Sequence, residues 1–208
     1  MGRLTIAAAV AAWAIPLAAL VDSIVPDLYM DEIFHIPQVQ RYCRGDFLTW
    51  DPMITTPPGL IAEVFDALCT TALLRSTNVI MAVICGVLVH DLLLCIRPEI
   101  GKRKATAFAI LVALYPIHWF FTFLYYTDVA SLAAVLAMYL FCLKKQFWVS
   151  AAFGAFSILL RQTNVIWMIF FAANGAIAHA QCLYVKNNVL RRKYGIPSSS
   201  YGIQSVKF

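Results

Sequence analysis

The sequence has little charge for its length. Only 13% of its 208 residues are Asp, Glu, Lys or Arg, whereas 62% are hydrophobic and the mean hydropathy is +0.76. A typical globular chain is about 25% charged and about 45–50% apolar. A water-soluble fold of this size could not bury so much apolar surface, so the composition argues against a soluble enzyme, a disordered chain and a nucleic-acid-binding module. Most of this protein is therefore expected to lie in lipid.

Two familiar short motifs are absent as well. No Asn-x-Ser/Thr acceptor occurs, so glycosylation gives no check on topology, and no Cys-x-x-Cys pair occurs, so a zinc site is not expected. Cys43 and Cys69 are the only two of the six cysteines in a segment predicted to lie outside the cytosol, and they could pair if that segment is luminal. We favour unpaired cysteines. The other four lie inside or at the edge of apolar segments as small packing residues: Cys85, Cys95, Cys142 and Cys182.

Apolar segments recur along the chain at lengths suited to a membrane, which a helix of about 20 residues can cross. They predict an all-α membrane protein with about six spans, near residues 4–21, 77–96, 105–124, 127–143, 147–160 and 165–183. Together these form one polytopic domain over 1–183. Residues 1–21 also resemble a signal peptide, but the apolar core is long and lacks a clear cleavage site, so we favour an uncleaved anchor.

The charges divide the chain into two sides. Residues 22–66 carry eight acidic residues and two arginines, a net charge of −6, and the remainder carries +11. Six spans place twelve of the sixteen basic residues on the side of the N-terminus, as the positive-inside rule requires. We therefore expect both termini in the cytosol, a long acidic luminal loop over 22–76, and a basic, disordered cytosolic tail over 184–208.

The acidic loop holds the first candidate site residues. Asp31 and Glu32 are adjacent carboxylates just after the first span, and on a helix Asp31 would share a face with His35. A carboxylate at a lipid interface with a histidine in reach could act as a general base. From spacing alone we favour the simpler interpretation, in which both acids are solvated or begin an interfacial helix. Two acids and one histidine are weak support for a metal, and none is expected.

Further along, Trp50 suits an interfacial position, and Asp51 begins a stretch whose prolines and Gly59 enforce a non-helical path. Residues 60–76 are apolar but carry Glu63, Asp66 and Arg75. A seventh span here would place the later basic loops outside, so an interfacial helix is the better interpretation.

Polar residues also interrupt the later apolar segments. Asp128 follows Tyr126 at the start of an expected helix, which it could simply cap. Arg161 lies near the bilayer boundary, with Gln162 and Asn164 beside it. Arginine in a membrane is costly enough to suggest function, and its guanidinium could bind a lipid-linked phosphate. An interfacial hairpin that only turns the chain is an equal alternative.

Four stretches taken together resemble the dolichyl-phosphate-glucose-dependent α-1,2-glucosyltransferases, which complete the lipid-linked precursor of N-glycans. The matching stretches are Tyr29–Cys43 (YMDEIFHIPQVQRYC), Trp50–Leu60 (WDPMITTPPGL), Phe120–Val129 (FFTFLYYTDV) and Arg161–Trp167 (RQTNVIW). They occur in the family's order and cover about residues 20–175. The resemblance implies a C-type glycosyltransferase fold in the endoplasmic reticulum membrane, of which this chain would be the N-terminal part.

In that class an acidic residue of the first luminal loop is the general base, so the resemblance implies Asp31, with Glu32 as the alternative. With the resemblance, we favour the catalytic interpretation of these acids over the one in which they are only solvated or begin an interfacial helix. As substrate-binding residues it implies, in the four motifs, His35, Gln38, Trp50, Asp51, Tyr126, Asp128, Arg161, Gln162 and Asn164. The implied substrates are dolichyl-phosphate-glucose and a diglucosylated dolichol-linked oligosaccharide; neither a metal nor a further cofactor is expected, and protein partners are unknown.

The implied reaction inverts the anomeric carbon, because a β-linked donor gives an α-1,2 product. Inversion needs one carboxylate to take the proton of the acceptor hydroxyl, and an arginine can stabilise the leaving phosphate. The chain departs from the family in its shorter length and in the sequence after Lys186. We therefore expect a truncated or alternatively spliced member. A non-catalytic membrane protein that binds partners or lipid is the alternative function, and a transporter, which would need an internal repeat, is third.

Overall fold

The computed structural model describes residues 2–54 and 69–194, and within these ranges all regular secondary structure is helical. The all-α prediction is confirmed for this part of the chain. The elements, in chain order, are α1 (Gly2–Ile24), α2 (Glu32–Cys43), α3 (Thr71–Ile96), η2 (Pro98–Ile100), α4 (Gly101–Ala113), α5 (Pro116–Thr122), α6 (Thr127–Leu143), α7 (Phe147–Leu160), η3 (Gln162–Asn164) and α8 (Val165–Tyr194).

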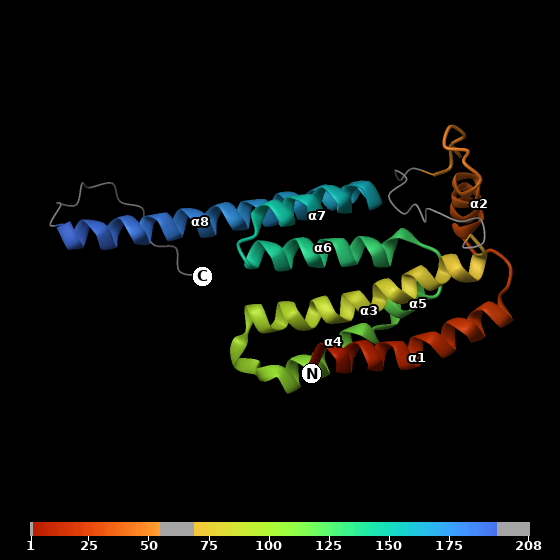
Figure 1. Cartoon of the computed structure of the whole chain (residues 1–208), viewed down its shortest axis with the longest axis horizontal. Coiled ribbons are helices and arrows are strands. Elements are labelled where there is room, and N and C mark those ends of the chain that lie inside the picture. The colour runs from red at the N-terminus through yellow and green to blue at the C-terminus, as the bar shows by residue number, and fades with distance from the viewer. Residues whose placement is uncertain (1, 55–68, 195–208) are drawn as a thin grey trace.

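The longer helices run side by side in one elongated bundle, and α2 stands across one end of it (Figure 1). Helix α3 lies at the centre, where it packs against α1, α4 and α6, while α6 also contacts α7 and α8. The last turns of α8 leave the bundle at the end opposite α2 (Figure 1). The end of the bundle that carries α2 is called the α2 end below.

Within residues 2–54 and 69–194, three helices are long and apolar enough to cross a membrane: α1, α3, and Gln162–Lys186, which comprises η3 and most of α8. Helices α4 and α5 pass the same test together but meet at 65°, because Pro116 begins α5 after a two-residue break. Proline is favoured at a first helical position and cannot continue the preceding helix. Helices α6 and α7 are apolar but have only 17 and 14 residues. The structure thus supports three or four full-length spans.

The span expected over 105–124 is divided between α4 and α5, and two other boundaries differ most from the prediction. Helix α3 begins at Thr71 rather than 77, because the Thr70 side chain accepts a hydrogen bond from the Leu73 amide and caps the helix. Residues 71–76 therefore belong to α3 and not to an interfacial helix; the part of that expected helix before residue 69 lies outside the described residues. Helix α8 continues to Tyr194, so residues 184–194 are helical where a disordered tail was predicted. The rest of that tail also lies outside the described residues.

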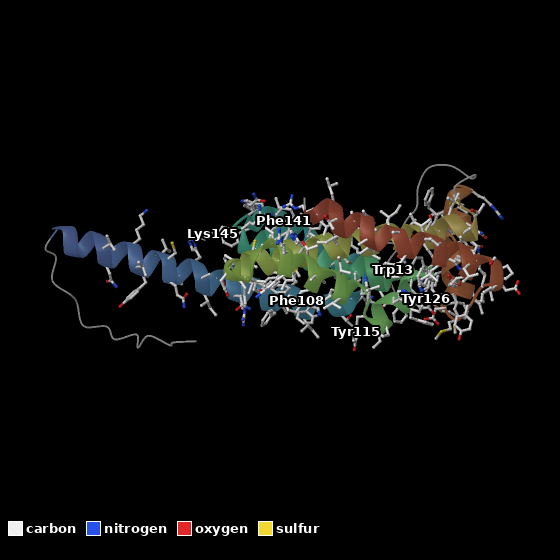
Figure 2. All side chains as sticks on the ribbon, turned by 90° about the horizontal axis from the view of Figure 1, so that it is seen from below. Trp13, Phe108, Tyr115, Tyr126, Phe141 and Lys145 are labelled. Carbon is white, nitrogen blue, oxygen red and sulfur yellow. A yellow bond between two sulfur atoms is a disulfide. The ribbon has the colours of Figure 1, made fainter. Side chains whose placement is uncertain are left out.

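Small side chains allow the helix axes to approach closely in the core. Ala82 and Cys85 of α3 pack against Val129 and Ala133 of α6, and all four are almost fully buried. Small residues at helix interfaces are typical of membrane proteins, where large apolar side chains face lipid instead. Phe108 and Tyr115, for example, point outward from the bundle (Figure 2) and are at least half exposed.

Basic side chains gather at the end of the bundle opposite α2. Arg3 of α1 binds Asp91 of α3 there through a hydrogen bond from Nε to Oδ1 and an ion-pair contact between Nη2 and Oδ2, both 2.8 Å long. Lys145, in the turn between α6 and α7, lies toward the same end, whereas Tyr126 lies near the α2 end (Figure 2). Which end of the bundle faces the cytosol stays a prediction from the sequence.

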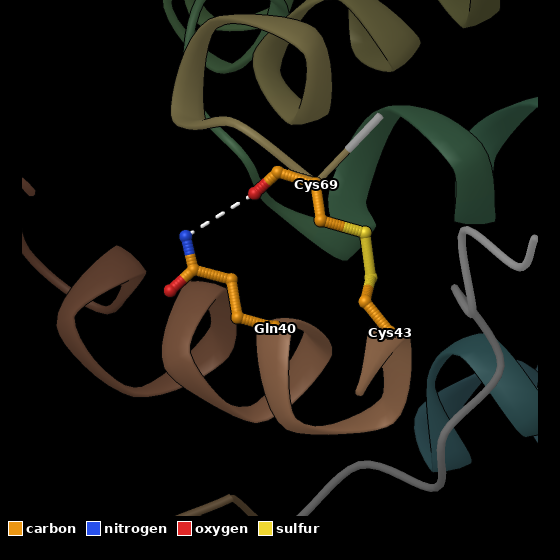
Figure 3. Close-up of a disulfide and its surroundings, with 3 residues drawn as sticks. All are labelled: Gln40, Cys43 and Cys69. Carbon is orange, nitrogen blue, oxygen red and sulfur yellow. Dashed lines mark hydrogen bonds between the residues drawn. A yellow bond between two sulfur atoms is a disulfide. The ribbon is translucent and has the colours of Figure 1, made fainter. Parts of the chain in front are cut away.

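A disulfide joins Cys43, the last residue of α2, to Cys69 just before α3 (Figure 3). Our preference for unpaired cysteines is therefore wrong. The Cα atoms are 6.6 Å apart, within the range that a disulfide spans. The Gln40 side-chain amide donates to the Cys69 carbonyl at 3.2 Å and supports the same contact. The sequence could not supply this proximity, which depends on α2 folding back across the end of α3.

Removing this disulfide is expected to lower stability. It closes a loop of 26 residues, and the chain-entropy model gives about 3.5 kcal/mol for a loop of that length. We expect the double variant Cys43→Ser and Cys69→Ser to melt at a lower temperature in detergent than the unchanged chain. Cys95 and Cys182, which are exposed and unpaired, provide the control; their replacement by serine should leave the melting temperature unchanged. Equal melting of both double variants would contradict the structural role.

Candidate active site

The candidate site begins at the turn that leads from α1 into α2. Met30 has a φ of 54°, a left-handed conformation that is unusual for a residue with a side chain. Asp31 follows it as the N-cap of α2, and Glu32 is the first helical residue. This turn sends the two adjacent carboxylates into different surroundings: Asp31 is exposed, whereas Glu32 is completely buried.

Glu32 is held by four hydrogen bonds in the interior. Its Oε1 accepts from the Tyr125 amide at 2.6 Å and from Arg75 Nε at 3.0 Å. Its Oε2 accepts from Arg75 Nη2 at 2.7 Å and from the Tyr29 amide at 3.2 Å. A buried carboxylate with these four partners has little remaining capacity to bind a substrate. Glu32 is therefore suited to fix the structure of the site.

Arg75, near the start of α3, organises this part of the chain. Besides Glu32 it binds the Asp22 carboxylate through Nη1 at 2.9 Å. The same Nη1 donates to the carbonyl of Val25, and Nη2 donates to that of Asp27. The side chain is 2% exposed. One guanidinium thus ties the end of α1, the following turn and the start of α2 to the central helix.

Asn78, one turn after Arg75 on α3, holds the loop that precedes α6. Its side-chain amide donates to the carbonyl oxygens of Leu124 and Tyr126 at 2.6 and 2.8 Å. This loop supplies both the Tyr125 amide that binds Glu32 and the Tyr126 side chain. The loop and the start of α2 are therefore positioned by the same two turns of α3.

Tyr126 connects this loop to Asp31. Its hydroxyl accepts a hydrogen bond of 2.9 Å from the Asp31 backbone amide, and its ring lies 6.4 Å from the ring of His35. His35 is half-buried one turn into α2, where the charges of both Asp31 and Asp128 act on it. The structure therefore brings Asp31, His35, Tyr126 and Asp128 together at the α2 end.

Arg161 joins the same group through Asp128. Its Nη1 donates to Asp128 Oδ1, and both side chains remain partly exposed. Asn164 is buried and donates to Ser131 Oγ at 2.7 Å and to the Ser157 carbonyl at 2.8 Å, so it fixes η3 against α6 and α7. Gln162 lies exposed on η3 between these two residues. The Arg161 motif thus lies beside the start of α6.

Gln38 of α2 forms a separate group with Trp50 and Asp51 of the loop that follows α2. The Gln38 side chain donates to the Thr49 carbonyl at 2.7 Å and accepts from the Asp51 amide at 2.9 Å. Trp50 donates from its indole to the Ile54 carbonyl at 3.1 Å. Gln38 is buried and both of its polar atoms bind backbone, which indicates that it shapes this loop. None of the hydrogen bonds described for these three residues reaches Asp31 or Arg161.

Comparison with known proteins identifies the family. Residues 25–197 match the model of the DIE2/ALG10 family, and this range includes every side chain described at the candidate site except Asp22. This chain belongs to the DIE2/ALG10 family. An Arabidopsis thaliana protein named "Dol-P-Glc:Glc(2)Man(9)GlcNAc(2)-PP-Dol alpha-1,2-glucosyltransferase" is 51% identical to it in an alignment of 197 residues. This alignment covers 85% of the chain.

Proteins of the same name in Gibberella zeae and Homo sapiens are 38% and 39% identical over 80% and 70% of the chain. The chain spans only 39%, 28% and 35% of the length of the Arabidopsis thaliana, Gibberella zeae and human relatives. No solved structure matches it. Membership of the DIE2/ALG10 family agrees with the resemblance seen in the sequence.

In this DIE2/ALG10 chain, burial lowers the pKa of His35 below its ordinary value of 6.5, although the charges of Asp31 and Asp128 partly oppose the shift. A histidine whose pKa is lowered by folding binds its proton more weakly in the folded chain than in the unfolded chain. Protonation therefore favours unfolding, and the stability associated with neutral His35 is present above the unfolded pKa and lost as the pH falls below it.

The melting temperature in detergent is accordingly expected to fall between pH 7.5 and pH 5.5, and His35→Gln is expected to reduce this fall. Comparing the two melting temperatures at both pH values checks the prediction. His179→Gln, which removes an exposed imidazole from α8, is the control and should retain the dependence of the unchanged chain. A fall of the same size in the His35→Gln variant would contradict the assignment.

Two residues of the site were missed by the sequence analysis. Arg75 was noted only as a charge in an apolar stretch, and Asn78 was treated as part of a span. The sequence did contain a signal for both residues, because a polar side chain inside an apolar membrane segment is costly and usually has a polar partner. What the sequence could not supply was the partner, since Glu32 is separated from Arg75 by 43 positions.

Proposed function

We propose that this chain forms the catalytic end of an inverting glucosyltransferase that moves glucose from dolichyl-phosphate-glucose to a diglucosylated, dolichol-linked oligosaccharide. The observation that carries the proposal is the different placement of the two adjacent acids. Glu32 is buried and accepts four hydrogen bonds, whereas Asp31 is exposed beside His35, Tyr126 and the Asp128–Arg161 pair. The names of the relatives supply the substrates.

In the proposed step, Asp31 takes the proton from the acceptor hydroxyl, and the hydroxyl oxygen attacks the anomeric carbon of the donor glucose. The bond from that carbon to the phosphate oxygen breaks on the opposite face, and its electron pair remains on the phosphate. Arg161 stabilises the phosphate charge that develops. Asp31 and Arg161 supply the base and the anion-binding group, so the step requires no further cofactor.

We also propose six membrane crossings in the endoplasmic reticulum, with the α2 end in the lumen, in a fold of the C-type glycosyltransferase class. Helices α6 and α7 are about 25 and about 21 Å long at 1.5 Å per residue, close to or somewhat below the ~27 Å hydrocarbon thickness of that membrane. The basic residues at the opposite end, including Lys145 and Arg3, favour a cytosolic position for both termini. A disulfide at the α2 end is consistent with an oxidising lumen.

Complementation tests the proposed function. The chain would be expressed in cells that lack the terminal α-1,2-glucosyltransferase, both alone and joined to the part of the Arabidopsis thaliana relative that it does not match. The lipid-linked oligosaccharides would then be analysed by mass spectrometry. We expect the triglucosylated form to reappear with the fusion, and its appearance with the chain alone would show that this portion suffices. Persistence of the diglucosylated form in cells that contain the fusion protein would contradict the proposal.

A further inference from the structure

Helix α8 lies along one side of the bundle, where it packs against α6, α7 and η3 (Figure 1). In its most apolar 18-residue stretch 6% of the residues are buried, compared with 33% in the central helix α3. Exposed apolar side chains alone do not call for a protein neighbour, because lipid can cover them. The polar residues on the same helix are more informative, because lipid tails cannot bind them.

Asn174, His179 and Gln181 are exposed polar side chains of α8, and all three belong to the segment that is long and apolar enough to cross a membrane. The imidazole of His179 meets the ring of Phe147 edge-on, and within the described part of the chain no hydrogen bond reaches it. A polar side chain that faces lipid is costly, so such residues usually face a protein neighbour or water. This part of α8 is therefore better suited to another helix than to lipid.

A groove of about 460 Å³ lies beside this part of α8 and is lined by α6, α7 and α8. Its α8 side carries Ala172, Gly175 and Ala176, its α7 side carries Ser150 and Ala151, and His179 is also among its lining residues. Small side chains on both walls let another helix approach closely, as is typical of helix packing in membranes. The groove thus offers a further helix close packing and, at His179, a hydrogen bond.

The family relationship indicates which helix belongs there. This chain spans 39% of the length of the Arabidopsis thaliana relative, and the family match continues through the described end of α8. The resemblance places this chain at the N-terminal part of the family fold, so the remainder of the relative follows α8. Because consecutive elements are usually neighbours in space, a helix of that remainder is expected to return beside α8.

We infer that the groove between α7 and α8 binds a membrane-spanning helix from the portion of the family sequence that this chain does not match, and that this portion associates with the chain as a separate polypeptide. Helices associate in a membrane through packing and hydrogen bonds, which require no covalent link. The bound helix presents small side chains to Ala172 and Ala176 and a hydrogen-bonding side chain to His179. The inference concerns assembly and goes beyond the proposed glucose transfer.

Co-purification tests the association. The full chain would be expressed with the unmatched portion of the Arabidopsis thaliana relative as a second, differently tagged polypeptide, and the chain would be isolated in mild detergent. We expect comparable amounts of both. Ala172→Trp, which fills the groove, should lower recovery of the partner at least fivefold, whereas Ala173→Trp, at an exposed position outside the groove lining, should leave recovery unchanged. Equal recovery with the two variants would overturn the inference.

The covalent fusion of the two portions provides a second measurement. Ala172 is exposed in this chain, so Ala172→Trp should leave the melting temperature of the chain alone unchanged but lower that of the fusion by several degrees. Ala173→Trp should change neither. A fusion whose melting is insensitive to Ala172→Trp would overturn the groove as the docking site. A sensitive fusion, combined with no recovery of the separate polypeptide, would overturn association between two polypeptides.

One further result would identify a different occupant. If light scattering shows that the chain alone is a dimer which Ala172→Trp converts to monomers, the groove binds a second copy and the inference is wrong. Because none of these measurements uses glucose transfer, the two proposals can fail separately. A complex that assembles as expected but transfers no glucose contradicts only the proposed function, whereas a fusion that transfers glucose and melts independently of Ala172→Trp contradicts only the interface.

Discussion

Replacing Asp31 with asparagine is expected to lower kcat for glucose transfer by about 10²–10⁴-fold, the usual contribution of a positioned general base. The KM values for both substrates should change little, because the amide keeps the size of the side chain and the Asp31 backbone still binds Tyr126. Transfer from labelled dolichyl-phosphate-glucose by the purified fusion protein provides the measurement. The melting temperature should also be unchanged, since the Asp31 side chain is exposed and the buried network is centred on Glu32.

Two comparisons make this prediction specific. Asp27→Asn removes an exposed carboxylate four positions earlier, whose side chain belongs to no part of the proposed site, and should transfer at the unchanged rate. Glu32→Gln should instead lower the melting temperature, because a neutral amide is a poor partner for the buried Arg75. If Asp31→Asn keeps full activity while Glu32→Gln loses kcat without losing stability, the base is Glu32 and the assignment is wrong.

Replacing Arg75 with methionine is expected to lower the free energy of unfolding by about 3–5 kcal/mol, because it leaves the buried Glu32 carboxylate without its counter-ion. The variant also frees the turn between α1 and α2 from α3. Thermal melting in detergent measures the loss. Arg3→Met is the matched control, since it also breaks an arginine–aspartate pair, but one whose arginine is 64% exposed; such pairs contribute at most about 1 kcal/mol.

A second substitution separates the lost charge partner from general damage to packing. When Glu32→Met is added to Arg75→Met, no buried carboxylate remains, and apolar replacement of a buried ion pair is often nearly neutral. The double variant should therefore melt above the Arg75→Met single variant. A double variant that melts lower still would show that Glu32 has partners strong enough to hold it without Arg75, contrary to the network described here.

The long helices α1, α3, α6, α7 and α8 could be located from sequence because each contains a long, mostly apolar run. Helix α6 occupies 127–143, the interval expected for a span, and a proline begins α5 where the chain bends. The number of complete crossings could not be obtained in the same way. Helix length depends on caps and on contacts with neighbours, as Thr70 shows at the start of α3. The continuation of α8 to Tyr194 through a polar stretch likewise had no local apolar signal.

The candidate site was only partly predictable. The family resemblance selected Asp31, Tyr126, Asp128 and Arg161, and the structure brings these residues to one end of the bundle. The sequence could not distinguish Asp31 from Glu32, because adjacent carboxylates point differently only once the turn at Met30 is formed. The sequence also could not show that Gln38 binds the backbone of the loop that follows α2. Both distinctions depend on contacts between residues distant in the chain or on backbone conformation.

The most direct test of the central claim, inverting glucose transfer at Asp31, is the linkage of the product. The purified fusion protein and its Asp31→Asn variant would be incubated with labelled β-linked dolichyl-phosphate-glucose and the diglucosylated lipid-linked oligosaccharide, and the product treated with an α-1,2-specific glucosidase. The account predicts labelled product from the unchanged protein only, with the label fully released by the enzyme. Product that resists the glucosidase, or equal product from the Asp31→Asn variant, would contradict it.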